Sequence, residues 1–435
     1  MATNWAGNVT YTGRVHRPAS IDELRRLVAG SARIRALGSG HSFNRIGDGP
    51  GELVSLEGLP PVIELDTAGA AVTVAAAVRY AALAPRLHAA GLALANLGSL
   101  PHVSVGGACA TATHGSGEHN ANLSTAVRAI ELLTADGDLL TVDRSTDGFD
   151  GMVVSLGALG VVTGLTLATV PAFEVRQYVY EDLPFDTLDD RLLGAAYSVS
   201  LFTTWASPRF EQVWLKHRVD PQTAEPQTAE PQTAEPQTAE PQTAEPDPPW
   251  PGARAATGQR HPIPGQPAAR CTGQLGVPGP WHERLPHFRP GFVPSSGDEL
   301  QSEHFVARAD LIAALDVLDG IRAVVAPVVQ VSEIRTVAAD GLWLSPCYRR
   351  DSATIHFTWR PEPAAVRVAI DAVEDRLAPF DARPHWGKLF GSRGELAIGR
   401  YERLADFRRL LGRFDPAGKF GNPFVDRLVH RSGPG

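Results

Sequence analysis

The stretch GSGHSFN, residues 38–44, decides how this chain is interpreted. It directly follows RIRAL at 33–37, whose apolar residues are typical of a strand. Glycines after a strand let backbone N–H groups approach a ligand closely, and that ligand is often a phosphate. His41 places a larger, nucleophilic side chain among these small residues. Taken alone, His41 is more simply explained as a surface histidine, so the rest of the chain must decide.

The composition is that of a globular protein with room for two domains in its 435 residues. The net charge is −8 and no Lys/Arg stripe stands out, so we expect no nucleic-acid partner. Cys109, Cys271 and Cys347 are far apart, which fits neither a disulfide framework nor a zinc site. Such cysteine usage suits a reducing compartment, and we expect a cytoplasmic protein.

One window resembles a membrane span without being one. Residues 152–170 carry no charge and are nearly long enough to cross a bilayer. Glycines interrupt the window and Pro171 ends it, so we expect two short buried strands around a glycine turn. The N-terminus lacks the basic-then-apolar order of a signal peptide, and no membrane partner is expected.

The first third of the chain predicts α+β structure. Ser20 and Glu23 have capping-box spacing and open a helix. Further on we expect strands at 62–66 and 71–78, a helix at 79–91 and a hairpin at 129–143. Residues 97–117 hold no Asp, Glu, Lys or Arg and are rich in Gly, Ser, Thr and Ala. A tightly packed turn and helix explains this stretch as well as a ligand-binding surface does.

Five tandem copies of PQTAE occupy residues 221–245. Pro, Gln, Thr and Glu without large apolar residues cannot bury a core. We expect a disordered surface loop without chemistry, inserted in the second domain at about 221–246.

Two predicted strands, 330–338 and 353–359, carry polar pairs two residues apart. Glu333 and Arg335 share one strand face, and His356 and Thr358 share another. A single strand with such a face usually turns it to solvent, and that is the ordinary interpretation here. The alternative is a pocket for a polyhydroxy molecule, in which the carboxylate accepts and the guanidinium donates hydrogen bonds.

The sequence HWGK, 385–388, adds a candidate cation, Lys388, for developing negative charge. In isolation Lys388 is also an ordinary surface lysine, and His385 a core histidine. His282, Glu283 and His287 do not have the spacing of HExxH, so we expect no metal.

Several longer motifs identify a family. The chain resembles the flavin-dependent oxidases of the vanillyl-alcohol-oxidase type, and within them the polyol oxidases. The resemblance rests on RALGSGHSFN, SLPHVSVGG, ATATHGSG, EIRTVAADGLWLSPCY, ARPHWGK and DPAGKF. The PQTAE array is the departure from the family pattern.

The resemblance implies FAD bonded covalently through its 8α-methyl group to His41. The other implied cofactor contacts are Ala36, Leu37, Gly38, Ser39, Gly40, Ser42, Ser104, Gly107, Thr111, Ala112, Thr113, His114, Val162 and His385. Gly98 is small, and if it lies against the reactive flavin edge it leaves room for O2.

The resemblance also implies oxidation of the terminal alcohol of alditols such as xylitol or sorbitol to the aldose, with O2 reduced to H2O2. The implied substrate contacts are Ser99, Glu333, Arg335, Thr358 and Lys388. Arg335 and Lys388 would stabilise alkoxide character, and either His356 or Glu333 would be the base. We expect a monomer.

The implied fold class is α+β, with a two-subdomain FAD-binding domain of the PCMH type. A substrate domain with a mixed sheet flanked by helices would cover the flavin. The expected boundaries are 1–173, 174–384 and a C-terminal segment, 385–435, that returns to the first domain. Two rivals remain: a sugar-1,4-lactone oxidase or dehydrogenase of the same fold, and a carbohydrate-binding protein that has lost its flavin.

Overall fold

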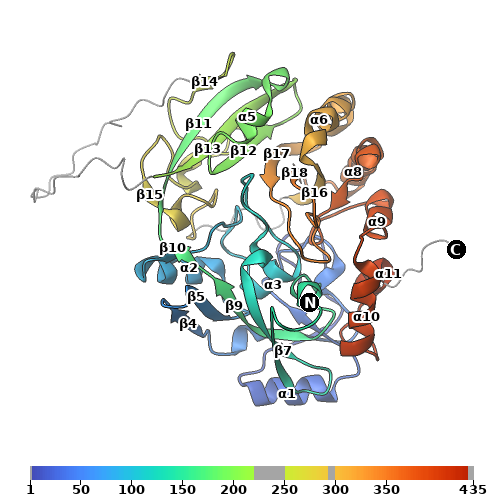
Figure 1. Ribbon diagram of the computed structural model, residues 1–435. Helices are drawn as coiled ribbons and strands as arrows, with labels where there is room; N and C mark the ends of the chain where they lie inside the picture. The colour runs from blue at the N-terminus through green and yellow to red at the C-terminus, as the bar shows by residue number, and fades with distance from the viewer. Residues whose placement is uncertain (1, 220–249, 292–298, 430–435) are drawn as a thin grey trace, which may run out of the picture.

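The computed structural model describes residues 2–219, 250–291 and 299–429. Two bodies of sheet lie one above the other, with a column of helices, α6 and α8–α11, along one side (Figure 1). The α+β class expected from sequence is confirmed. The PQTAE array lies outside the described residues.

A small parallel sheet carries the GSGHSFN segment. Its strands are β1 (Arg14–His16), β2 (Ile34–Leu37) and β3 (Glu52–Ser55), in the order β1-β3-β2. The helix α1 (Ile21–Gly30) is capped as predicted, because Ser20 Oγ accepts from the backbone N–H of Glu23 at 3.2 Å. The loop that begins at Gly38 therefore lies at the carboxyl end of a parallel strand, where α/β proteins commonly bind ligands.

A five-stranded antiparallel sheet completes the lower body. It has the order β4-β5-β9-β7-β8, and the predicted hairpin forms its β7 and β8. The strands are β4 (Ile63–Asp66), β5 (Ala71–Ala75), β7 (Val127–Leu133), β8 (Leu139–Asp143) and β9 (Val161–Ala168), with the short pair β6 (Leu92–Ala93) and β10 (Val170–Pro171) beside them. Three helices belong to the same part of the chain: α2 (Tyr80–Ala89), α3 (Val105–Ala110) and α4 (Phe149–Val153).

The prediction of two strands in residues 152–170 is wrong for the first of them. That part ends the short helix α4, and only the second part forms a strand, β9. Gly148 begins the helix with φ +81°, a conformation that glycine adopts without strain. In the described part of the chain, no helix has the length and apolar character needed to cross a membrane.

The upper body is a nine-stranded sheet. Its order is β14-β11-β13-β12-β17-β18-β16-β19, with β15 paired to β11. The strands are β11 (Glu174–Pro184), β12 (Ser198–Thr203), β13 (Arg209–Arg218), β14 (Arg254–Ala255), β15 (Gly279–Pro280), β16 (Leu300–Ala307), β17 (Val329–Val337), β18 (Ser352–Trp359) and β19 (Arg383–Pro384). The sheet was expected to be mixed, but its described strands pair only in antiparallel fashion.

Helices cover one face of this upper sheet. Its apolar residues, among them Ile334 and Ile355, pack in one core with α6 (Leu311–Asp319) and α8 (Pro363–Leu377). Two shorter helices, α5 (Asp190–Leu193) and α7 (Arg322–Val325), also belong to this part of the chain. The polar side chains of the central strands are therefore left to the opposite face, toward the lower body.

The C-terminal helices α9 (Ser392–Ile398), α10 (Leu404–Phe414) and α11 (Pro423–Val429) lead back to the parallel sheet. Arg35 Nη1 donates to the carbonyl of Phe420 at 2.7 Å, and the N–H of Ile34 donates to the carbonyl of Lys419 at 2.9 Å. These contacts agree with the expected return of the C-terminal segment, and we retain the predicted domain boundaries as a proposal.

Candidate active site

One cavity of about 680 Å³ joins the glycine-rich loops of the lower body to the polar face of the upper sheet. Every residue predicted for cofactor, substrate, oxygen access or catalysis lines this cavity, except Ala112. Ala112 is 1% exposed and packs in the apolar core of the lower body instead. Residues separated by up to 383 positions in the chain, Trp5 and Lys388, thus meet around one space.

The loop end of the cavity is built from backbone and small side chains. A side-chain carbon on Gly38 or Gly107 would lie 2.9 Å from Ser104 Oγ, so neither position has room for one. Ser104 Oγ is buried and has no hydrogen-bond partner among the described residues. The backbone N–H of Ser104 donates to Ser39 Oγ at 3.1 Å, which holds the two loops together. An unpartnered hydroxyl between two glycines fits a ligand with acceptor oxygens, as the FAD pyrophosphate has.

His41 lies at this end, held by the N-terminal segment. The N–H of Trp5 donates to the carbonyl of Gly40 at 2.7 Å, and the rings of Trp5 and His41 stack with centroids 5.3 Å apart. Burial lowers the pKa of His41 to about 4, so its imidazole is neutral at physiological pH and keeps a nucleophilic lone pair. Trp5 was not predicted as a site residue, because nothing in its local sequence indicates this stacking.

The polar faces of three neighbouring strands form the other end. Glu333 in β17 lies opposite His356 in β18, and His356 lies opposite Glu303 in β16. The ordinary interpretation of the predicted polar pairs as solvent-facing is wrong, since Glu333 and Arg335 are each only 5% exposed. The physical reason is that these strands are central in the sheet and the lower body closes off their polar face. His356 and Thr358 are buried as well.

Glu303 is the centre of this end, although it was not predicted as a site residue. Its Oε1 accepts from Arg335 Nη2 and its Oε2 from Lys388 Nζ, both at 2.7 Å. Burial raises the pKa of Glu303, but the neighbouring Lys388, His114 and Arg335 outweigh burial and hold that pKa well below its usual range. Gln301 and Glu303 have the same two-residue spacing as the predicted pairs, and that signal could have identified them.

Lys388 and Arg335 complete the cationic side. Lys388 is 15% exposed at its side chain, so it is not the surface lysine that its local sequence allows. Burial lowers the pKa of Lys388, while Glu303 opposes the shift. Arg335 Nη1 donates to Ser99 Oγ at 3.3 Å, which places the predicted substrate serine beside the predicted cation.

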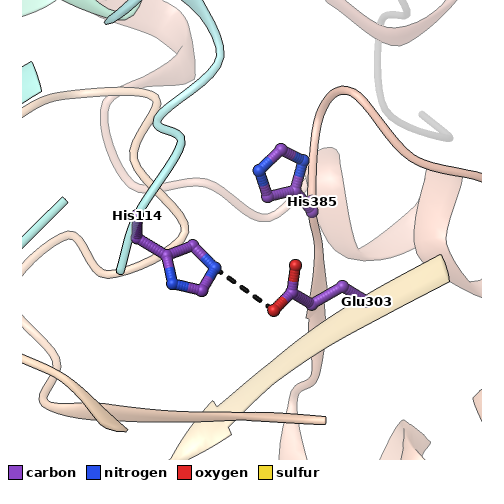
Figure 2. A group of neighbouring side chains, drawn as sticks. All are labelled: His114, Glu303 and His385. Carbon is purple, nitrogen blue, oxygen red and sulfur yellow. Dashed lines mark ion pairs between the residues drawn. The ribbon is translucent and has the colours of Figure 1, made fainter. Parts of the chain in front are cut away.

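His114, Glu303 and His385 lie within reach of a single ion, with all three ligand atoms within 4.8 Å of one another (Figure 2). His114 Nε2 lies 3.2 Å from Glu303 Oε1, the pair that Figure 2 marks. Both oxygens of the carboxylate already accept from cationic side chains, so a metal ion would bring a third cation to the same group. We therefore interpret the two histidines as neighbours of a charged cluster formed by Glu303, Glu333, Arg335 and Lys388.

A second series of contacts links Glu333 to His287 and, through His287, to the buried Lys216. His287 Nε2 lies 2.7 Å from Glu333 Oε1, and Lys216 Nζ lies 3.3 Å from His287 Nδ1. Lys216 also donates to the carbonyls of Leu285 and Pro286. An ammonium group can only donate, so Nδ1 of His287 accepts and its Nε2–H donates to the carboxylate.

Burial lowers the pKa of Lys216 to about 7 and that of His287 to about 4. Neither residue was predicted as a site residue. Lys216 is on β13 and His287 follows β15, and no spacing in the sequence relates them.

Known proteins resemble this chain in sequence. A family model described as an FAD binding domain matches residues 13–143, and one described as D-arabinono-1,4-lactone oxidase matches 304–428. An alditol oxidase of Streptomyces sp. (strain IKD472 / FERM P-14339) is 51% identical over 98% of both chains. An L-gulono-1,4-lactone dehydrogenase of Mycobacterium tuberculosis is 28% identical over 98% of both chains.

Among solved structures, a cholesterol oxidase of B. sterolicum aligns with a TM-score of 0.73 over 98% of this chain and 96% of its own. At 16% identity, that likeness concerns the fold alone. The alditol oxidase, by contrast, matches along almost the entire length at high identity. The chain therefore belongs to the alditol oxidase family, within the FAD-dependent oxidases of the vanillyl-alcohol-oxidase type.

Proposed function

We propose that the chain is an FAD-dependent oxidase that converts the terminal alcohol of an alditol, such as xylitol or sorbitol, to the aldose. The balanced reaction is RCH2OH + O2 → RCHO + H2O2. The observation that carries the proposal is the single cavity, which places a neutral histidine and glycine-rich loops at one end and a buried charged cluster at the other. The full-length likeness to an alditol oxidase supports the choice of substrate class.

FAD would be held by the loops around Ser39 and Ser104 and tethered covalently to His41. When bound, FAD takes two electrons and a hydrogen from the alcohol carbon and passes them on to O2. The stacking of Trp5 on His41 supports the tether, because it fixes the orientation of the ring before a bond forms. Gly98 would leave space for O2 next to the cofactor.

The charged cluster would bind the polyol. Ser99, Thr358 and Glu333 offer hydroxyl and carboxylate groups to the substrate hydroxyls. Arg335 and Lys388 would stabilise negative charge that develops on the reacting oxygen as its proton leaves. Both cations are held by Glu303 before substrate arrives, so little reorganisation is needed.

Between the two candidate bases, we assign proton removal to His356. Burial, and then Lys388, lower the pKa of His356 well below its usual value, so the imidazole is neutral and can accept a proton. Glu333 already accepts from His287 and lies 3.6 Å from Arg335 Nε, which leaves it a weaker acceptor of a further proton. Glu333 then orients the distal hydroxyls.

The lactone oxidase or dehydrogenase activity is the alternative. It has the support of the family model matching residues 304–428 and of a relative at 28% identity. Oxygen uptake with xylitol, sorbitol and L-gulono-1,4-lactone separates the two. We expect uptake with the alditols, partly returned by catalase, and uptake with the lactone alone would overturn the proposal.

A carbohydrate-binding protein without flavin is the remaining rival. Purified protein that is yellow, with absorption near about 450 nm, excludes it, and colourless protein that binds no added FAD supports it. The cytoplasmic location and the monomeric state expected from sequence belong to this proposal as predictions. Size-exclusion chromatography coupled to light scattering tests the monomeric state.

A further inference from the structure

We propose that Glu303 balances the charge of the substrate pocket and so makes it selective for uncharged polyols over sugar acids. This inference rests on the proposed function, which names the polyol but gives no reason why a carboxylate-bearing sugar would be refused. Glu303 is a positioning residue here, since it acts through Arg335 and Lys388.

The contacts of Glu303 leave it little freedom. It is 1% exposed, and its two oxygens accept from the two cations at 2.7 Å. The ring of His114 packs beside them, with Nε2 3.2 Å from Oε1. A carboxylate with both oxygens occupied in this way cannot turn toward a substrate, so it fixes the cations in place.

Among the described residues that line the cavity, the formal charges of the side chains cancel; Lys216, whose pKa burial lowers to about 7, lies behind His287 and does not line the cavity. Two cations, Arg335 and Lys388, face two carboxylates, Glu303 and Glu333. Burial lowers the pKa of every histidine next to them, so these imidazoles add no charge at physiological pH; they are His114, His287, His356 and His385. The remaining charged groups of the cavity wall also balance, with Arg35 and Arg270 against Glu57 and Glu299.

A neutral pocket has no electrostatic preference for an anion. Without Glu303 the same pocket would carry a net positive charge, and a guanidinium and an ammonium would both be free for a carboxylate. A sugar acid differs from the alditol by just such a carboxylate. Specificity is a difference of two affinities, and Glu303 lowers the affinity for the competitor.

The test is the Glu303→Gln variant, which keeps the shape of the side chain and removes its charge. Two quantities are measured: kcat/KM for xylitol by oxygen uptake, and the inhibition constant of xylonate. We expect kcat/KM for xylitol to fall roughly 100-fold as the cations lose their fixed positions. We expect xylonate to inhibit roughly tenfold more tightly, since it gains a charged hydrogen bond.

Glu374→Gln is the matched control. Glu374 is 3% exposed and is paired with His304 outside the cavity, so its substitution removes an equally buried carboxylate. It should leave the ratio of xylitol to xylonate affinity unchanged. The proposal is overturned if Glu303→Gln loses xylitol oxidation while xylonate inhibition stays the same, because Glu303 would then be structural only.

A measurement on the unaltered holoenzyme covers the case in which Glu303→Gln does not fold. Perturbation of the flavin spectrum by xylitol and by xylonate gives both affinities without turnover. We expect xylonate to bind at least about tenfold more weakly than xylitol, because its carboxylate adds an unbalanced negative charge to the neutral pocket. Equal affinities would overturn the inference, whereas failure to oxidise any alditol would instead overturn the proposed function.

Discussion

The two ends of the cavity differ in how their residues are distributed along the chain. The loop end is made of residues 38–42 and of Ser104, Gly106 and Gly107, which apart from His41 present small side chains and backbone groups to the space. The strand end is made of single side chains, charged ones from β16, β17 and the segment after β19 and polar ones from β18. In the proposed function, the shape and backbone groups of the first end hold the cofactor, and the fixed charges of the second end support the reaction.

The two ends are joined by direct contacts. Asn44 Nδ2, from the GSGHSFN segment, donates to the carbonyls of Trp386 and Lys388 at 2.8 and 2.7 Å. The N–H of Phe43 donates to the carbonyl of Gly387 at 2.7 Å. The position of the cation is thus tied to the position of the cofactor loop, and the substitutions below separate the contributions of the two ends.

The largest effect is expected at the loop end, from His41→Ala. The variant should lose the covalent flavin completely, because no nucleophile remains for the bond. The tryptic peptide 36–45 carries the mass of FAD in the unaltered protein and should be bare in the variant. Acid precipitation is the matching control: the yellow colour should stay with the unaltered protein and leave the variant. An unmodified peptide from the unaltered, yellow protein would contradict the tether.

At the strand end, Lys388→Met should lower kcat by a factor of roughly 100 to 1,000, as when one group that stabilises developing negative charge is removed. The flavin content should not change, because Lys388 belongs to the other end of the cavity. Steady-state oxygen uptake at saturating xylitol gives the first value and the flavin spectrum the second. Loss of flavin together with activity would show that the two ends cannot be separated.

The pH dependence of kcat should report the same lysine. Protonated Lys388 and neutral His356 are the active forms, so above the pKa of His356 the rate should stay constant up to the folded pKa of Lys388 and fall as pH rises through it. Burial lowers that pKa, with Glu303, Arg335 and Glu333 as the charged neighbours, so the fall should begin below the value of 10.5 that is usual for a free lysine. In Lys388→Arg the alkaline fall should disappear, since a guanidinium does not titrate in this range. If kcat of Lys388→Arg falls at alkaline pH in the same way as kcat of the unaltered enzyme, that fall belongs to the titration of another group.

A smaller effect on activity is expected from a change at Lys216, which contacts Glu333 only through His287. Lys216→Met removes the buried ammonium that fixes the His287 tautomer, so KM for xylitol should rise roughly tenfold and kcat should change less. The melting temperature should not fall, because a buried charge without a carboxylate partner is costly and Met fills a similar volume. A fall in kcat and in melting temperature without a change in KM would indicate a purely structural lysine.

The smallest effect is expected from Gly98→Ala. The added carbon would lie 3.6 Å from the His114 carbonyl oxygen and 3.7 Å from Thr113 Cγ2, which is ordinary contact. Folding should therefore be unchanged within about 0.5 kcal/mol, while reoxidation of the reduced enzyme by O2 slows. Gly38→Ala is the contrasting variant, since its added carbon meets Ser104 Oγ at 2.9 Å and should reduce flavin binding. Unchanged oxygen reactivity in Gly98→Ala would remove the assigned role of Gly98.

The contrast between the ends also explains what the sequence could predict. The residues of the loop end were named from the family resemblance, which rests on local motifs such as GSGHSFN, and all of them except Ala112 line the cavity. Taken alone, the local pattern left His41 as a surface histidine. The strands at 330–338 and 353–359 were predicted too, but not the burial of their polar faces. Whether a strand face is exposed to solvent depends on which elements pack around that strand. The strand order β12-β17-β18-β16 cannot be predicted from the spacing of residues in the sequence.

Glu303, His287 and Lys216 were missed for the same reason, since each acquires its role through a contact between distant segments. Glu303 pairs with residues 32 and 85 positions away, and Lys216 reaches His287 across 71 positions. The repeat at 221–245 lies outside the described residues, so its expected character stays a prediction.

The central claim is that both ends act on one substrate held against one cofactor. The most direct test is to mix the yellow enzyme with xylitol without oxygen and to monitor the flavin absorbance at about 450 nm. We predict that the flavin bleaches within the time of one turnover, and that Lys388→Met with the same flavin content bleaches at least about 100-fold more slowly. Bleaching at an equal rate in both proteins would contradict the account, since the charged cluster would then have no part in the step that reduces the cofactor.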